Sequence, residues 1–202
     1  MKSKLILIGS LAVLYFLFFS PEPKPIEYQD AAKLTTLPIQ KETKEKPFTF
    51  KGFNVQPLAE FTLTARVLSN KSYKWSWGNE ADLSPVDLAL GWGPMADSNN
   101  LKNIKVTQRG RWYYWRANGS AISRKDIEHN SGNMHIIPAT DGVYDKVTTL
   151  SKGHVLELSG YLVEVTKEGW TWRSSLSRTD TGDKACEVFY VKQVKVIPSD
   201  KK

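Results

Sequence analysis

The sequence predicts a mainly β protein with short helices, which we expect to form a small barrel of the oligonucleotide/oligosaccharide-binding type (OB-like) after an N-terminal transmembrane helix. Several segments alternate apolar and polar residues with a period of two, as half-buried strands do. Two such segments near the C-terminus are joined by a short turn that contains glycine, which is a strong local signal for a hairpin. Helix-start signals fall between other strands. An α+β arrangement and a β-sandwich are the alternatives that this pattern leaves open.

Residues 1–20 are expected to be a transmembrane anchor or a signal. Lys2 and Lys4 precede residues 5–19, which contain no charged side chain. This run is short for a hydrocarbon core of about 30 Å, but the lysine side chains can snorkel and narrow the gap. A cleaved signal peptide would need small residues at its end, where bulky aromatic residues stand instead. An uncleaved anchor is therefore our first interpretation, and a cleaved signal is the second.

The lysines before the apolar run also predict an orientation. Positive residues flank the cytoplasmic end of a membrane helix, so Lys2 and Lys4 place the N-terminus in the cytoplasm. We therefore expect a single-pass protein of the cell membrane that contacts the bilayer through residues 5–19. Its C-terminal domain would then lie outside the cytoplasm, in the periplasm if the host is Gram-negative.

Residues 21–56 are predicted to be a tether rich in proline and lysine. Six of the ten prolines fall between Pro21 and Pro57, and proline interrupts both helices and strand ladders. Residues 57–198 then form a single β-rich domain that is large enough for one hydrophobic core. The lone cysteine, Cys186, excludes an intrachain disulfide, so the core must hold this domain together.

The basic charge is spread over the chain rather than gathered in one segment. The net charge is +7, of which residues 1–56 carry +3 and the remainder +4. Binding to nucleic acid requires a concentrated basic face. We therefore do not expect nucleic acid as a partner, and we consider a protein or a glycan instead.

The expected strands follow one another with short connections. They lie at residues 61–68, 73–77, 104–115 with a break at Gly110, 155–165, 170–176 and 185–197. Along the last strand, one face should carry Cys186, Val188 and Tyr190, and the other should carry Glu187, Phe189 and Val191.

Three short helices are expected between the strands. Ser84, followed by Pro85 and Asp87, predicts a helix that ends at residues 91–94. Ser123 and Asp126 repeat the capping pattern and predict a helix that stops before Gly132. A weaker helical pattern covers residues 141–150.

Four segments of the chain resemble a widespread family of small, uncharacterised bacterial proteins. The segments are ADLSPVDLALGWGPM at residues 81–95, RWYYW at 111–115, NMHIIPA at 133–139 and GWTWRSSL at 169–176, which continues to ACE at 185–187. The resemblance spans roughly residues 57–197. It implies a bacterial origin and one contiguous domain, and it brings no assigned activity and no catalytic role.

A polar corner between the second helix and the next strand holds the candidate catalytic residues. Glu128, His129 and His135 could supply a general base with its orienting group, or ligands for a metal. The spacing of the two histidines matches no strong metal motif, however, and we expect no metal or other cofactor. The alternative is a structural corner whose polar side chains bond to exposed backbone.

Aromatic and basic residues interleave at two places and could form a binding face. Aromatic rings stack on sugars and bases, and arginine adds cation–π or phosphate contacts. The candidate binding residues are Arg111, Tyr113, Trp115, Trp170 and Trp172. Because strand residues alternate, one side of residues 111–116 should fill the core and the other can be exposed. The alternative is that these tryptophans are core residues.

Cys186 could in principle pair with His129 or His135 as a thiolate nucleophile. It stands in an alternating apolar run, however, which favours a small buried hydrophobic residue. No strong catalytic signature remains in the sequence. We therefore expect an anchored binding or assembly module, and the alternative is a hydrolase or metal-dependent enzyme that uses the His129–His135 corner.

Overall fold

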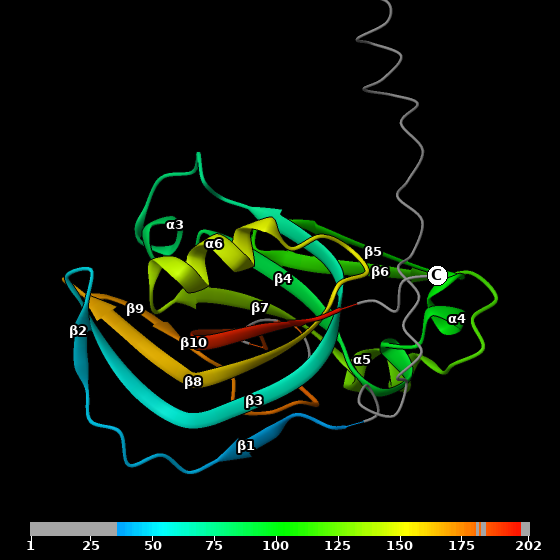
Figure 1. Ribbon diagram of the computed structural model, residues 1–202, viewed down its shortest axis with the longest axis horizontal. Helices are drawn as coiled ribbons and strands as arrows, with labels where there is room; N and C mark the ends of the chain where they lie inside the picture. The colour runs from blue at the N-terminus through cyan, green and yellow to red at the C-terminus, as the bar shows by residue number, and fades with distance from the viewer. Residues whose placement is uncertain (1–35, 181, 183–184, 199–202) are drawn as a thin grey trace, which may run out of the picture.

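The computed structural model describes residues 36–180, 182 and 185–198, and in this part the protein is mainly β with a few short helices (Figure 1). The expected mainly β class is confirmed. The expected anchor at residues 1–20 lies outside the described residues. Within the described ranges, none of the helices has the length and apolar character needed to cross a membrane.

Five strands pair with one another in a cycle. β3 (Phe53–Ser72) pairs with β4 (Val86–Gly91), β4 with β7 (Ser131–Pro138), and β7 with β10 (Glu187–Ile197). β10 pairs with β8 (Val155–Lys167), which pairs again with β3. Only the β7–β10 pairing in this cycle is parallel. Each of the five strands therefore has a hydrogen-bonded neighbour on both sides.

Shorter strands extend this arrangement. β1 (Ile39–Lys41) and β2 (Phe48–Phe50) both pair with β3, and β9 (Trp170–Arg173) pairs with β8. A separate hairpin consists of β5 (Ile104–Arg109) and β6 (Trp112–Ala117). The predicted break at Gly110 is the turn of this hairpin, and the predicted C-terminal hairpin is the β8–β9 pair.

The expected tether is wrong for residues 39–56, which contain β1, β2 and the start of β3. Proline and the charge run do not prevent pairing here, because both short strands lie along β3 and Pro47 falls between them. The ordered fold therefore begins well before residue 57.

The helices are short and lie in the connections. They are α3 (Asn79–Leu83), the 3-10 helix η1 (Gly93–Met95), α4 (Ser98–Leu101), α5 (Arg124–His129) and α6 (Asp141–Thr149). The predicted capping box of α5 is present, since the side chains of Ser123 and Asp126 each accept a hydrogen bond from the other's backbone N–H. The weaker pattern at residues 141–150 is confirmed as α6.

Two predicted elements are wrong. The residues after Ser84 form β4 rather than a helix, and the helix in this region, α3, ends just before Ser84. The capping pattern is overridden because β4 gains partners on both sides, β3 and β7. Residues 73–77 form a turn instead of a strand, with the Ser76 N–H donating to the Tyr73 carbonyl.

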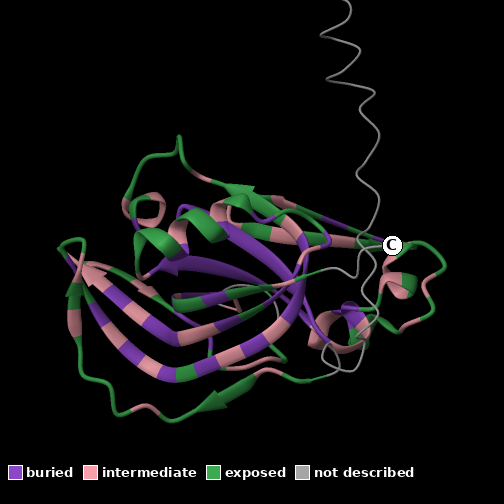
Figure 2. Ribbon diagram, viewed as in Figure 1, coloured by how far each residue is buried: buried purple, intermediate pink, exposed green. Residues whose placement is uncertain are grey.

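The main core lies on one face of all five strands in the cycle. The faces predicted for the last strand are confirmed: Phe189 and Val191 join the main core, and Val188 and Tyr190 join a second cluster on the opposite face. Figure 2 shows buried and less buried residues alternating along β3 and β8, whereas β4 and β7 are buried throughout. The outer face of β4 and β7 is therefore covered, and what covers it forms the candidate site.

Candidate ligand-binding cleft

A cleft of about 1010 Å³ lies beside the outer face of β7. Its walls come from segments that are far apart in the sequence: the connection from β3 to β4, the tip of the β5–β6 hairpin, and the chain from β8 to β10. The residues that line it include Tyr73, Trp77, Glu80, Arg111, Trp112, His135, Glu164, Trp172, Arg173, Asp180 and Cys186.

A carboxylate and an imidazole lie side by side beneath the cleft. Asp87 and His135 are opposite each other on β4 and β7, and both are buried. The Nδ1 atom of His135 lies 2.9 Å from Asp87 Oδ1, which is an ion-pair distance, although the contact lacks hydrogen-bond geometry. The His135 ring forms part of the cleft lining, whereas Asp87 lies behind it.

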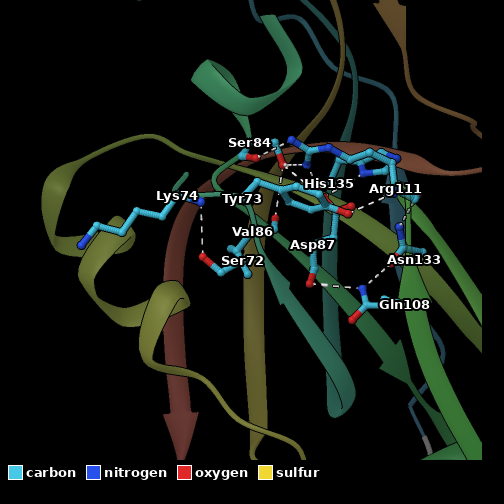
Figure 3. A network of polar contacts seen from close by, with 10 residues as sticks. All are labelled: Ser72, Tyr73, Lys74, Ser84, Val86, Asp87, Gln108, Arg111, Asn133 and His135. Carbon is cyan, nitrogen blue, oxygen red and sulfur yellow. Dashed lines mark hydrogen bonds and ion pairs between the residues drawn. The ribbon is translucent and has the colours of Figure 1, made fainter. Parts of the chain in front are cut away.

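Arg111 neutralises this buried carboxylate. Its Nη1 atom donates to Asp87 Oδ1 at 2.6 Å, and its Nη2 atom donates to the Ser84 carbonyl at 3.0 Å (Figure 3). A buried carboxylate without a cation would be strongly destabilising. The Arg111 guanidinium is therefore occupied by the protein itself.

The hairpin turn places Arg111 at this position. Gly110 and Arg111 have φ angles of 59° and 68°, the left-handed pair that a two-residue hairpin turn of this kind requires. The Arg111 N–H donates to the Tyr73 hydroxyl at 3.0 Å, and its guanidinium lies 3.6 Å from the centre of the Tyr73 ring. Burial is the main cause that raises the pKa of Tyr73, followed by the charge of Asp87.

Amide side chains fix the hairpin to the outer face of the sheet. Gln108 on β5 donates to the Asn133 side chain on β7 at 2.6 Å, and Asn133 donates to the Arg111 carbonyl at 3.0 Å (Figure 3). Further along β6, Tyr113 and Trp115 pack against the cluster beneath the hairpin. The tip of the hairpin is thus held on the sheet by polar contacts and its stem by apolar ones.

Tryptophans form much of the apolar surface of the cleft. The Trp172 ring lies 4.7 Å from the His135 ring, centre to centre. Trp112 is 37% exposed, and Trp77 is 96% exposed on the connection that leads to α3. Trp170 is on the same face of β9 as Trp172, with ring centres 6.0 Å apart, but it contacts Phe53 and does not line the cleft; its indole N–H donates to Glu80 at 3.1 Å and so links β9 to α3.

A smaller cavity of about 200 Å³ lies beneath the hairpin, with Tyr113, Trp115, Glu128 and Glu187 in its lining. Glu187 is buried, and its Oε1 atom accepts a hydrogen bond from Arg178 at 2.6 Å. Burial raises the pKa of Glu187 to about 7, and the Arg178 charge opposes this rise. A Cβ at position 132 would lie 3.2 Å from Glu187 Oε2, so any larger residue there would require the Glu187 side chain to shift by a few tenths of an ångström.

Cys186 lines both the cleft and the smaller cavity, and it is partly buried. Burial and the charge of Glu187 raise the pKa of the Cys186 thiol to about 12. A thiol of such pKa is protonated at neutral pH, so it lacks the activation that a cysteine nucleophile needs. This environment favours a structural role for Cys186.

The structure separates the predicted catalytic residues. His135 lines the cleft, whereas Glu128 lines the smaller cavity and forms an ion pair with Arg124 at 2.8 Å. His129 is at the end of α5 and lines neither space. In the described part of the chain, no group of three or more histidine, cysteine or acidic side chains could hold a metal.

The predicted binding residues are divided in a similar way. Arg111 and Trp172 line the cleft, and Tyr113 and Trp115 line the smaller cavity. Trp170 lines neither space; it packs against the second core cluster, as Trp172 also does. The exposed face of β6 carries Trp112, Tyr114 and Arg116 instead.

Sequence reasoning missed Asp87 and Tyr73 as residues of the site, and Trp77 was recognised only as one of many aromatic residues that could form a binding face. The signal for Asp87 was available, because a carboxylate inside the apolar run of residues 86–90 must find a partner if that run is buried. The roles of Tyr73 and Trp77 depend on which segments meet across the cleft, and no local pattern reports this.

Comparisons with models of protein families, with curated protein sequences and with solved structures gave no match to this chain. The expected membership of a family of small bacterial proteins therefore stays a prediction.

Proposed function

We propose that the protein is a membrane-anchored, extracytoplasmic binding module whose ligand occupies the cleft. The anchor in this proposal is the apolar run at residues 5–19, and the lysines before it support the orientation. The described domain would then present its cleft to partners outside the cytoplasm.

We further propose that the five-stranded cycle is an OB-like barrel. In chain order its strands are β3, β4, β7, β8 and β10, and the last is parallel to the third. Helix α6 lies in the connection between the third and the fourth. OB-type barrels bind their ligands on the face of the second and third strands, between the loop that joins strands one and two and the loop that joins strands four and five.

The position of the cleft is the observation that carries this proposal. The second and third strands are β4 and β7, and His135 on β7 lines the cleft. Trp77 comes from the connection between the first two strands, and Trp172 from the connection between the last two. Two of the three tryptophans of the cleft therefore stand where an OB-type module would hold its ligand, and the third, Trp112, comes from the hairpin between the second and third strands.

A binding screen with a matched pair of variants tests the proposal. The full-length protein in phospholipid nanodiscs would be titrated by calorimetry with neutral hexasaccharides, a twelve-residue oligothymidylate and a lysine hexapeptide. We expect a ligand in one of these classes, and we expect Trp112→Ala to weaken its binding about tenfold, equivalent to about 1.4 kcal/mol. Trp112 lines the cleft, whereas Tyr114 is on the same exposed face of β6 but does not line it.

Tyr114→Ala should therefore bind like the wild type. The proposal would be contradicted if Trp112→Ala and Tyr114→Ala weakened binding equally, or if no ligand of the three classes bound.

The contact between Asp87 and His135 favours a second candidate, a hydrolase. A carboxylate beside a histidine at the base of a cleft is an arrangement that can orient a general base. This differs from the predicted His129–His135 corner, because Asp87 replaces His129 as the partner of His135. Hydrolysis of a bound probe, abolished in His135→Gln without loss of binding, would support the enzyme over the module.

A further inference from the structure

We propose that the cleft binds a neutral oligosaccharide. This inference rests on the proposed function, because it names the chemical class of the ligand for the same cleft. It is drawn from the charges, the aromatic surfaces and the size of the cleft.

The two arginines that line the cleft are already paired with carboxylates. Arg111 donates to Asp87 at 2.6 Å, and Arg173 donates to Glu164 at 2.7 Å. A polyanion such as nucleic acid is bound through cations that can exchange counterions for phosphates. Arg111 is largely buried in its ion pair, whereas Arg173 is 55% exposed and pairs through Nη1 alone, so the lining offers a polyanion one accessible guanidinium whose charge Glu164 already balances.

Two further carboxylates, Glu80 and Asp180, line the cleft. Among the described residues, no cation forms an ion pair with either of them, and each accepts one side-chain hydrogen bond, from Trp170 and from Ser175 respectively. A carboxylate has about four acceptor positions, so both retain unused capacity. The cleft therefore offers acceptors for a ligand that carries many O–H donors, which is the property of a sugar.

Trp77 supplies an apolar surface that the protein itself does not cover. It is 96% exposed, although tryptophan normally buries most of its large side chain. One face of a pyranose ring presents mainly C–H groups, which pack flat against an indole. Covering this indole removes apolar surface from water at about 25 cal/mol per Å².

The size and shape of the cleft fit several sugar rings. Its volume of about 1010 Å³ is at the upper end of pockets that hold drug-sized ligands. Tryptophan lines it from three segments, Trp77, Trp112 and Trp172. A monosaccharide would fill only a small part of this volume, whereas an oligosaccharide has enough rings to contact tryptophans from more than one of these segments.

A basic peptide is the principal competing ligand, since Glu80 and Asp180 would also attract cations. The lining also carries Arg111 and Arg173, however, so charges of both signs are interspersed and no continuous acidic surface is offered to a lysine-rich chain. A neutral ligand needs no such surface and still uses the carboxylates as acceptors.

Trp77 and Trp75 provide a matched pair of variants for the test. Trp75 is 86% exposed and lies two residues away, but it does not line the cleft. The full-length protein in nanodiscs would be titrated with cellohexaose, chitohexaose and maltohexaose, with oligothymidylate and the lysine hexapeptide as the competing probes. We expect at least one hexasaccharide to bind, Trp77→Ala to weaken that binding about tenfold, and Trp75→Ala to change it less than twofold.

The salt dependence is a second readout. Binding of a neutral sugar should change less than twofold between 50 and 500 mM NaCl, because no counterions are released. If oligothymidylate or the peptide binds instead, and Trp77→Ala weakens that binding, the sugar inference is overturned but the cleft is still the ligand site. Hexasaccharide binding that both tryptophan variants weaken equally would place the sugar elsewhere and also overturn it. Binding by none of the probes would overturn both the inference and the proposed function.

Discussion

Glu187 places an ionisable group at the end of the main core, beside Arg178. Its Oε2 atom is buried and has no hydrogen-bond partner among the described residues. Burial raises the pKa of this carboxyl from 4.5 to about 7, so the folded protein binds the proton more tightly than the unfolded chain does. The contribution of Glu187 to the free energy of unfolding is therefore greatest below pH 4.5, falls as the pH rises to about 7, and is constant above that.

We predict that Glu187→Gln removes this part of the pH dependence, because glutamine does not ionise. Chemical denaturation of the wild type between pH 4.5 and 7 should show a falling free energy of unfolding, and the slope should be flatter in the variant. Glu157 is exposed on β8, so Glu157→Gln serves as the control and should keep the wild-type slope. Equal slopes in wild type and Glu187→Gln would show that another group is responsible.

Individual residues of the candidate site were predictable only in part. Arg111, His135 and Trp172 were identified from the sequence, because clustered aromatic and ionisable side chains are visible without a structure. Their contacts were not predictable. Arg111 was expected on a binding face with Tyr113 and Trp115, but the positive φ at the hairpin turn directs it to Asp87, whose strand had been taken for a helix.

β8 passes between β3 and β10, and Gly160 allows it to do so. At this residue β8 pairs with Phe61 on one side and with Val191 on the other. An added Cβ would lie 2.0 Å from the Tyr190 carbonyl oxygen, which belongs to the backbone of β10. Since a backbone atom cannot move aside alone, a side chain at this position must displace the strand.

We predict that Gly160→Ala lowers the free energy of unfolding by about 3 kcal/mol, the upper part of the range for overpacked sites. Urea denaturation measures the difference, with Ser159→Ala as the control because that residue already has a Cβ and is adjacent on β8. A loss below about 0.5 kcal/mol in Gly160→Ala would mean that β10 can shift without penalty.

Helices and strands that carry two independent local sequence signals were predicted well. Strands that form only because they pair with a distant segment were not. The β8–β9 hairpin combines alternation with a glycine turn, and α5 combines a capping box with a stop. β4 carries a misleading helix-start pattern, and β1 and β2 are three residues each. Such short strands exist only because β3 offers an edge, which the sequence around them does not show.

The first part of the described domain, residues 39–56, belongs to the segment that was expected to be a tether. Phe48 and Phe50 lie with their ring centres 5.0 and 5.3 Å from that of Tyr190, and Glu45 accepts a hydrogen bond from Tyr161 at 2.9 Å. These contacts cover the second core cluster from outside. Residues 39–50 should therefore contribute to the stability of the whole domain.

We predict that a chain beginning at residue 51 unfolds at a lower temperature than one beginning at residue 36. The loss of two partly buried phenylalanines is worth about 2 kcal/mol, which for a domain of this size lowers Tm by roughly 4–8 °C. Thermal unfolding followed by circular dichroism measures the difference. The double variant Phe48→Ala/Phe50→Ala in the longer chain should reproduce most of it, and an unchanged Tm in the shorter chain would restore the tether interpretation for this range.

The cycle of five strands also has a consequence for how the molecule folds. Phe61 pairs with Gly160, and the main core needs Phe189 and Val191 from the last strand. These contacts join positions far apart in the sequence. The long intervening loops must close before the contacts can form, and proteins with such topologies fold slowly. During synthesis β3 therefore keeps one edge unpaired until β8 follows, and the core stays incomplete until β10 emerges. The domain acquires its order in a late step, after nearly the whole chain has been made.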